Sequence, residues 1–363
     1  MDDQIEIIIN NVAYTEIKEI DVVRDLDYLA GSFECAIANK FIVSSPVFIE
    51  DQVEIRIGDN PILLGNVDSL NSSITNSSHD YVFSGSDWTN DLVMTEISVN
   101  ATYNYTKLKK LCEKVLSDNE INYITVVDSS VNDFVEQNGV LVRQENDFPV
   151  GSEQSAETGD TIFDFLSVYA EKAGKILTSD GDGRLIIYSN SGIAKNLQLS
   201  NTVSGDNEKI KSASYTQDFT NRYKNVIVVS QAIDLEDGGH DTRGIETDDK
   251  VRRNVNKIII NESVADALTA KKIAEFEVNK RRSDSVQYNC SVMGFYATKN
   301  VLWQPNLLVS IIDENFGIKA TMLLKTVRYV YNETDGSICN LTFVSSDTYS
   351  LRTEASKFNE GVE

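Results

Sequence analysis

The sequence predicts a mainly β protein of the α+β class, with two similar β-barrel (tube-type) modules and, between them, an α+β domain and a helix-containing insertion. Three observations support this prediction. Apolar and polar residues alternate in short runs near both ends of the 363-residue chain, as in half-buried strands. Apolar residues at helical spacing occur only between these ends. A strand motif of the first module also returns in the second.

The returning motif consists of two short strands at a fixed distance from each other. Residues 63–67 (LLGNV) and 83–87 (FSGSD) reappear as residues 323–327 (LLKTV) and 343–347 (FVSSD), each time 260 positions later, as in 327 − 67. An offset of this size excludes solenoids and propellers, whose repeats are about 20–50 residues long. Because both halves of the motif keep their spacing, we expect a duplicated module rather than a chance resemblance of apolar strands.

The first barrel module is expected at residues 1–97. Residues 4–9 predict a strand that ends in a turn at Asn10-Asn11. Residues 33–38 and 53–57 alternate with period two, which is typical of strands with one buried face. Residues 58–61 (GDNP) combine turn-forming glycine and proline.

The α+β domain is expected at residues 98–197. Thr106 can cap a helix with apolar residues at 108, 111, 112, 115 and 116. Thr158 or Asp160 can cap a second helix, which should end at Gly174. Residues 175–188 predict a hairpin around the turn SDGDG, and the polar residues 128–156 predict a long loop.

The second barrel module is expected at residues 198–233 and 283–350, because residues 286–292, 301–312 and 320–330 are strand-like and Asp335-Gly336 predicts a hairpin turn. Residues 234–282 form the insertion, with a surface loop at 234–250 and a helix from Ser263 to Arg282. Residues 351–363 form a C-terminal tail.

Composition predicts a soluble globular protein without a membrane segment. Hydrophobic residues make up 41% of the chain and charged residues 25%. No apolar run approaches the roughly 20 residues of a spanning helix. The first residues are acidic, unlike a signal peptide, so we expect folding in the host cytoplasm.

The formal net charge of −23 argues against a surface that binds nucleic acid, since such binding needs Lys and Arg to neutralise phosphates. DNA could still slide past such a protein, and solubility alone explains the excess acid equally well. The four cysteines lie far apart without a C-x-x-C pair, which predicts buried apolar thiols rather than a zinc site or disulfides: Cys35, Cys112, Cys290 and Cys339.

Motifs for catalysis or cofactor binding are absent from the sequence. His79 and His240 are the two histidines, and both lie in polar, turn-like segments that do not suit a catalytic triad. The run beginning at Asp180 starts like a calcium loop, but its twelfth position is Ser191 instead of Glu. We therefore expect no enzyme activity, and we predict no catalytic, cofactor-binding or metal-binding residues.

Several segments, in this order, resemble the Mu-type phage baseplate hub proteins, the tail proteins of the P class. The resemblance begins at residues 24–33 (RDLDYLAGSF) and 83–93 (FSGSDWTNDLV) and continues through residues 157–166, 176–185, 218–228 and 302–309. The family has a Gly-Arg-Ser pattern where this chain has Gly85-Ser86-Asp87, so this chain lacks the arginine of that pattern.

The resemblance implies a structural hub of a contractile tail. In such a hub, a homotrimer presents two barrels per subunit as a pseudo-sixfold ring, which joins the hexameric tail tube protein to the trimeric central spike protein. It also implies a place in the virion baseplate, possible contacts with wedge or sheath components, and a channel through which DNA passes without specific binding. From the net charge we expect an acidic channel lining.

Three alternatives are retained. The chain could be the related spike hub of a type VI secretion system. It could instead be a carbohydrate-binding adhesin or a cell-wall hydrolase, because tail tips carry both, although no lytic motif is present.

Overall fold

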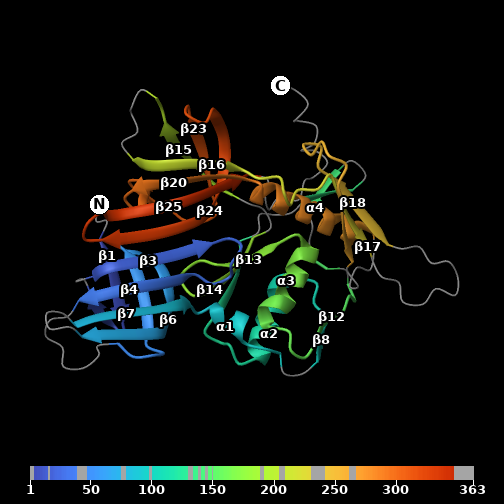
Figure 1. The fold of residues 1–363 in the computed structure, drawn as a ribbon. Coiled ribbons are helices and arrows are strands. Elements are labelled where there is room, and N and C mark those ends of the chain that lie inside the picture. The colour runs from blue at the N-terminus through green and yellow to red at the C-terminus, as the bar shows by residue number, and fades with distance from the viewer. Residues whose placement is uncertain are drawn as a thin grey trace.

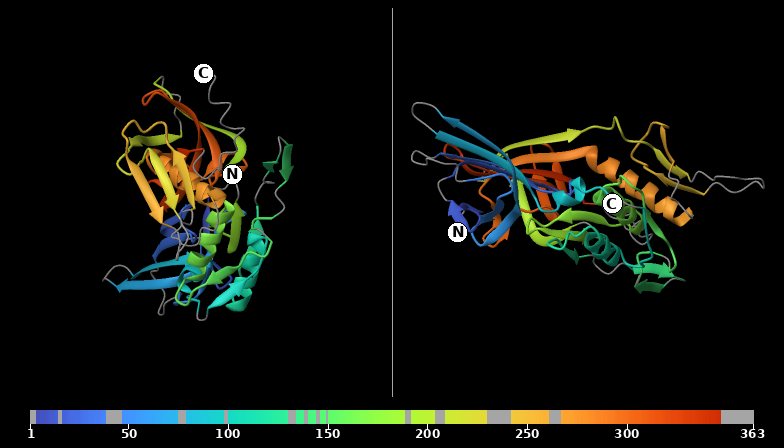
Figure 2. Two further views of the ribbon diagram at one scale, coloured as in Figure 1. Left: turned by 90° about the vertical axis from the view of Figure 1, so that its right-hand side faces the viewer. Right: turned by 90° about the horizontal axis from the view of Figure 1, so that it is seen from below.

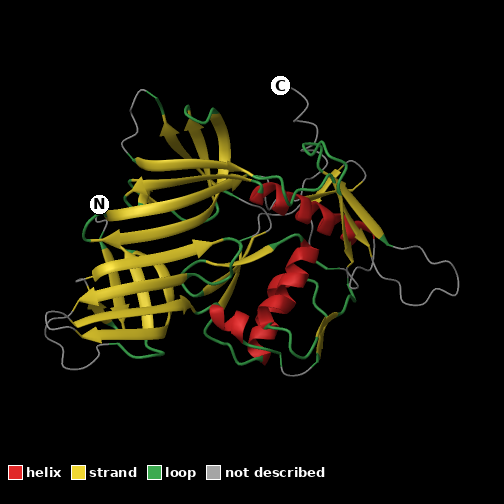
Figure 3. Ribbon diagram, in the orientation of Figure 1, coloured by secondary structure: helices red, strands yellow, loops and turns green. Residues whose placement is uncertain are grey.

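The computed structural model contains four helices and 25 strands in the part of the chain that it describes. The described residues are 4–14, 17–38, 47–74, 79–97, 100–129, 134–137, 140–143, 146–148, 150–188, 192–203, 209–229, 242–260 and 267–346. Strands dominate one side of the molecule and the helices lie on the other, as Figure 3 shows. The expected tail at 351–363 lies outside the described residues.

The first module is an antiparallel sheet in the order β3-β4-β7-β6-β5-β1-β2. Its buried residues alternate as expected; in β1, for example, Ile5, Ile7 and Ile9 are buried. The strands are β1 (Ile5–Ile9), β2 (Val12–Tyr14), β3 (Ile17–Asp25), β4 (Ser32–Ala38), β5 (Gln52–Ile57), β6 (Asn60–Ile74) and β7 (His79–Asp87).

The second module has the order β16-β20-β25-β24-β23-β15. A short pair, β21 (Tyr296–Thr298) and β22 (Val301–Leu302), precedes β23, so the single strand expected at 301–312 is interrupted. The six main strands are β15 (Ile193–Asn201), β16 (Ile210–Gln217), β20 (Val286–Met293), β23 (Leu307–Asp313), β24 (Ile318–Asn332) and β25 (Gly336–Ser345).

The two modules share five strands in the same spatial order and in the same order along the chain. The series β3-β4-β7-β6-β5 corresponds to β16-β20-β25-β24-β23. Every neighbouring pair in both series is antiparallel. The sixth strands differ, because β1 pairs antiparallel with β5 whereas β15 pairs parallel with β23. The fold therefore contains a duplicated five-stranded unit.

β-Bulges define the register of this duplication and correct its expected offset. One extra residue interrupts the pairing with the next strand, Asp68 in β6 and Lys325 in β24. Val67 precedes the first bulge and Leu324 the second, so these counterparts are 257 positions apart (324 − 67). The offset of 260, which matched Val67 with Val327, is wrong by three positions. Leu and Val suit the same buried strand positions, so a short apolar motif matches in more than one register.

The modules are joined edge to edge, because β24 also pairs antiparallel with β3. Figure 1 shows the result as a stack of eight strands that runs from β16 through β24 and β3 to β6. One hydrophobic core contains buried residues of both modules. Within a single chain, the two modules thus form one continuous sheet.

The α+β domain has its own core beside the first module. Helices α2 (Leu108–Asp118) and α3 (Ile162–Ala173) pack near a sheet of β13 (Ile176–Ser179), β14 (Arg184–Tyr188) and β9 (Thr125–Asp128). The remaining elements are the short helix α1 (Asn90–Met94), the strand pair β8 (Ala101–Tyr103) and β12 (Gln154–Ala156), and the hairpin β10 (Phe134–Gln137) and β11 (Val140–Arg143). The expected loop at 128–156 therefore contains three strands.

The helix starts differ from the expected caps. Helix α2 begins at Leu108, whose backbone N–H donates to the Asp147 carboxylate at 2.8 Å, so a residue distant in sequence replaces Thr106 as the cap. In α3 the cap is Thr161, whose hydroxyl accepts from the Asp164 N–H at 3.0 Å. The predicted C-terminal Gly174 is confirmed, with φ of 69°.

The insertion forms a small unit of its own and moves two expected boundaries. Strand β17 (Asn225–Val229), assigned to the second module, instead lies between β18 (Arg243–Thr247) and β19 (Asn256–Ile260). Helix α4 (Ala267–Asp284) lies alongside these strands, as Figure 2 shows, and contributes most of their core. β15 begins at Ile193, so the second module starts before residue 198. The expected loop at 234–250 contains β18, while residues 234–241 lie outside the described part.

Candidate assembly interface

Among the described strands, β3 and β24 are the pair through which the two modules are joined strand to strand. Seven residue pairs join them, from Thr326 opposite Asp25 to Asn332 opposite Glu19. On the core side, Ile20 and Val22 of β3 meet Val327 and Tyr329 of β24, and all four are fully buried. Burial of each such side chain contributes roughly 1.5–3 kcal/mol, so the junction is a stable part of the fold.

The solvent side of the junction carries an ion pair. The Arg328 Nε donates to the two carboxylate oxygens of Asp21 at 2.8 and 2.7 Å, and a terminal nitrogen of Arg328 donates as well. The hydrogen bonds that Arg328 donates to the Asp21 carboxylate raise the pKa of Arg328. Half of the arginine side chain is exposed, so the pair stabilises the chain by no more than about 1 kcal/mol. Its main effect is to fix the register.

Two carboxylates at the end of β3 hold the bulge of β24. The Thr326 hydroxyl donates to Asp25, which also accepts from the Asp27 N–H at 2.7 Å. Burial raises the pKa of Asp25, and the Thr326 hydrogen bond opposes this shift. Lys325, the extra residue of the bulge, contacts Asp27 and lies 3.4 Å from Asp284. Burial alone would lower the pKa of Lys325, but these acids raise it.

Three of the family-like segments meet below this junction, where the first module contacts the α+β domain. Asp87 is buried and accepts from the N–H groups of Gly31 at 2.7 Å and Thr89 at 2.9 Å. Burial raises the pKa of Asp87, and these hydrogen bonds lower it. Nearby, Arg24 donates to the Ser179 carbonyl at 3.2 Å. The motifs at 24–33, 83–93 and 176–185 therefore share one structural contact.

The glycines of the LLGNV and FSGSD motifs, Gly65 and Gly85, have a steric function. β6 and β7 approach so closely at their bulge that a Cβ on Gly85 would lie 1.9 Å from the Asn66 carbonyl oxygen. A Cβ on Gly65 would lie 1.9 Å from the Ser86 carbonyl oxygen. Since real Cβ atoms do not come so near to backbone atoms, only glycine fits at both positions.

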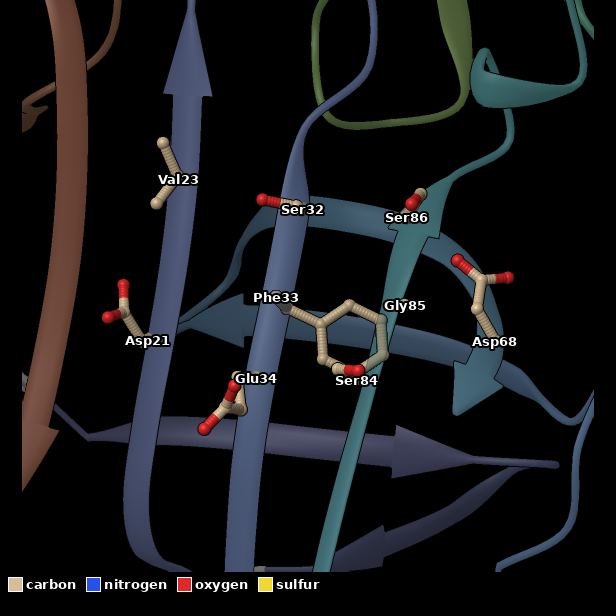
Figure 4. Close-up of a pocket in the computed structure, with 9 residues that line it drawn as sticks. All are labelled: Asp21, Val23, Ser32, Phe33, Glu34, Asp68, Ser84, Gly85 and Ser86. Atoms are coloured by element: carbon tan, nitrogen blue, oxygen red, sulfur yellow. The ribbon is translucent and has the colours of Figure 1, made fainter. Parts of the chain in front are cut away.

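The solvent face of β3, β4, β7 and β6 is acidic and slightly hollowed. A depression of about 400 Å³ is lined by the carboxylates Asp21, Glu34 and Asp68 and by three serine hydroxyls, as Figure 4 shows. Asp21 is held by Arg328. Within the described ranges, no group of His, Cys, Asp or Glu is arranged to hold a metal ion. The depression therefore presents negative charge and hydrogen-bond acceptors over an open sheet.

The family-like segment at 218–228 contributes an arginine to a buried ion pair. Arg222 donates to Asp248 through Nε at 2.5 Å and through a terminal nitrogen at 3.0 Å, and both side chains are almost fully buried. Arg282 of α4 approaches the same carboxylate at 3.3 Å. The pair lies within the insertion, and Arg222 also donates to the Ser285 hydroxyl at 3.2 Å, beside the start of β20. Local sequence patterns do not predict this pair, because Arg222 and Asp248 are 26 residues apart.

The remaining singled-out residues are not brought together. His79 is the first residue of β7, whereas His240 lies outside the described part. The turn at 180–183 joins β13 and β14 as the predicted hairpin, with Asp180 accepting from the Asp182 N–H at 2.9 Å.

No helix among the described residues is long and apolar enough to cross a membrane.

Family models match both ends of the chain. The N-terminal model of the Mu phage baseplate assembly protein GpP-like family matches residues 4–87, and the model of the fourth domain of the Mu phage baseplate assembly protein GpP matches residues 266–352. The baseplate hub protein gp44 of Escherichia phage Mu is 23% identical over 360 residues, which cover 95% of this chain and 89% of that protein.

Solved structures share the fold over nearly the whole chain. The 43 kDa tail protein of prophage MuSo2 from Shewanella oneidensis superposes with a TM-score of 0.78 and 23% identity, covering 95% of this chain and 99% of that one. The E. coli c3393 protein, a component of the type VI secretion system, superposes with a TM-score of 0.55 and 9% identity, covering 96% of this chain and 79% of that one. The two matched end domains and the relative that covers nearly the whole chain thus confirm the resemblance of this chain to the Mu-type phage baseplate hub proteins.

Proposed function

We propose that three copies of this baseplate hub protein form a ring of six similar modules, which joins a hexameric tail tube to a trimeric spike. The carrying observation is the duplicated five-stranded unit. Three chains with two such units each would provide six nearly equivalent docking positions around a threefold axis. A closed ring also removes the exposed sheet edges that a single chain would leave.

The division of labour in this ring follows the units of the fold. We assign the first module to residues 1–97, the α+β domain to about 98–192, the insertion to about 219–284, and the second module to the segments on either side of the insertion. The two modules would form the ring. The α+β domain and the insertion, which lie together on the side of the molecule away from the modules, would face wedge or sheath components (Figure 1).

Charge supports passage of DNA without specific binding. The net charge of −23 and the carboxylates Asp21, Glu34 and Asp68 on one sheet face would repel phosphates from a channel lined by that face. A gel-shift titration with double-stranded DNA should show no complex at physiological salt. Binding that weakens steeply as salt rises would contradict an acidic channel.

The role is structural rather than enzymatic, and its place is the tail baseplate of the virion, after assembly in the host cytoplasm. The matches to a baseplate assembly protein and a baseplate hub protein support the structural role and the place in the baseplate. The purified chain should leave peptidoglycan intact in a zymogram. Clearing of the gel at the mass of this chain would instead favour a cell-wall hydrolase.

Solution mass tests the ring directly. Native mass spectrometry should find a species of about 121 kDa, three times the chain mass of 40.4 kDa, and negative-stain images should show rings. The measurement is made with the chain alone and with its tail tube and spike proteins added, since partners can favour assembly by mass action. A chain that stays monomeric under both conditions would refute the proposal.

A further inference from the structure

The internal junction occupies one edge of each module and leaves the corresponding edges open. β16 is the counterpart of β3, and β6 is the counterpart of β24. Among the described strands, β16 pairs with β20 alone, and Ser69, Leu70, Asn71 and Ser73 of β6 pair with β7 alone. These two edges lie at opposite ends of the eight-strand stack in Figure 1. Each chain therefore carries one open copy of both halves of its own junction.

Bulges fix which residues correspond. In the pairing of β3 with β4, Lys18 is the unpaired extra residue, directly after Ile17. In the pairing of β16 with β20, Lys211 is the unpaired extra residue, directly after Ile210. Val23 therefore corresponds to Thr216, five residues beyond each bulge. In β24, Arg328 lies three residues after the bulge residue Lys325, and in β6, Asn71 lies three residues after the bulge residue Asp68. Arg328 therefore corresponds to Asn71.

The internal register can now be transferred to the open edges. Arg328 lies opposite Val23 in the junction, so the corresponding pair is Asn71 opposite Thr216. By the same rule, Thr326 opposite Asp25 becomes Ser69 opposite Asp218, and Val327 opposite Arg24 becomes Leu70 opposite Gln217.

Burial supports this transfer. Ile20, Val22 and Val327 are fully buried at the internal junction. Their counterparts Ala213, Tyr215 and Leu70 pack against the same core but remain only partly buried in a single chain. A strand added to either edge would complete their burial, as β24 and β3 do for each other.

Polar chemistry at the strand end is also retained. Asp25 accepts from the N–H two residues later, and Asp218 does the same with Thr220 at 2.8 Å. The hydroxyl that Thr326 donates to Asp25 has its counterpart in Ser69, which could donate to Asp218. The ion pair of Arg328 and Asp21, by contrast, is replaced by the neutral residues Asn71 and Ser214.

We propose that β16 of one copy pairs antiparallel with the outer half of β6 of the next copy, with Asn71 opposite Thr216. The occupant of each open edge is thus a second copy of this chain, bound head to tail so that the ring closes. This inference rests on the trimeric ring proposed above and adds the strands, the register and the neutral character of the seam between subunits. The seam within each chain is ion-paired, so the two kinds of seam alternate.

Engineered disulfides test the register. Opposite residues in an antiparallel pair have Cβ atoms about 4.5–5.5 Å apart, which a disulfide can bridge with small adjustments. Asn71 and Thr216 are both exposed. The double variant N71C/T216C should give a covalent trimer on a non-reducing denaturing gel. The matched control N71C/S212C, shifted by four residues or roughly 13 Å, should remain monomeric on the gel. The native cysteines are buried and do not compete.

Mixing the single variants shows that the bond joins different chains. N71C and T216C should each stay monomeric on the gel, whereas an equal mixture should yield a covalent dimer. A trimer by native mass that forms no disulfide in either arrangement, or that links N71C to S212C instead, would overturn the proposed seam while leaving the trimeric ring in place. A chain that forms no trimer in any variant or in the wild type would overturn the ring as well.

Discussion

Replacing Asp248 with Asn should destabilise the insertion strongly. The carboxylate accepts from Arg222 at 2.5 and 3.0 Å, from Arg282 at 3.3 Å and from the Lys250 N–H at 3.2 Å. The Asp248 side chain is 1% exposed and that of Arg222 is 2% exposed. An amide of the same shape keeps part of the hydrogen bonding but leaves a buried guanidinium without a counter-charge. Loss of one partner of such a pair costs about 3–5 kcal/mol.

We expect D248N to lower the free energy of unfolding of the insertion by about 3 kcal/mol. Urea denaturation followed by circular dichroism gives the overall change, and hydrogen exchange of peptides from α4 shows whether the insertion opens first. The control E113Q removes an exposed pair with Lys110, 2.6 Å away, and should cost less than about 0.5 kcal/mol. The double variant R222M/D248L, which removes both charges, should recover most of the loss. A D248N effect below about 1 kcal/mol, or a double variant as unstable as D248N, would refute the reasoning.

The same carboxylate predicts a pH dependence. Burial alone would raise the pKa of Asp248, but the hydrogen bonds and charges of Arg222 and Arg282 lower it below its usual value. The stabilisation is therefore fully present above the unfolded pKa of about 3.9 and is lost as pH falls through the lower folded pKa. Between pH 6 and pH 3, the wild type should lose more stability in the insertion than D248N does. Equal pH profiles would show that Asp248 does not carry this dependence.

Three further outcomes follow from the modules. G85A should cost roughly 1–3 kcal/mol or prevent folding, because its Cβ would meet the Asn66 carbonyl oxygen, while the neighbouring S84A should change the urea midpoint little. R328A, which removes an exposed ion pair, should cost less than about 1 kcal/mol in the same assay, and a larger loss would show that the pair does more than fix the register. Burial raises the pKa of the Cys290 thiol to about 12. The four native thiols should therefore resist a thiol reagent at pH 8 until urea is added, namely Cys35, Cys112, Cys290 and Cys339. Rapid reaction without urea would contradict their burial.

The strands and the duplication could be predicted from the sequence, because both follow from local patterns. Period-two alternation predicted β4 and β5, an apolar run before a turn predicted β1, and helical spacing predicted α2 and α3. The register of the duplication could not be obtained from the LL-x-x-V motif, since apolar residues alone do not distinguish one strand register from another. A better signal was present: Phe33, Cys35 and Ile37 in β4 correspond to Tyr288, Cys290 and Val292 in β20.

The interactions between distant segments were beyond a reading of local patterns. Asp147 caps α2 from 39 residues away, and Asp248 pairs with Arg222 from 26 residues away. β17 was assigned to the wrong unit, because an apolar strand does not show in its sequence which sheet it joins. The junction of β24 with β3 is likewise a property of the folded chain, and it provides the register used for the open edges.

The sixth strands, β1 and β15, run in opposite directions relative to their neighbours, and this difference decides which surfaces of the two modules are equivalent for a binding partner. A protein that touches only the five shared strands meets the same backbone arrangement twice in every chain. A protein that touches β1 or β15 meets an arrangement that occurs once. One chain can thus offer two equivalent binding sites to one partner and a single site to another. The reversed direction of one strand is enough to cause this difference.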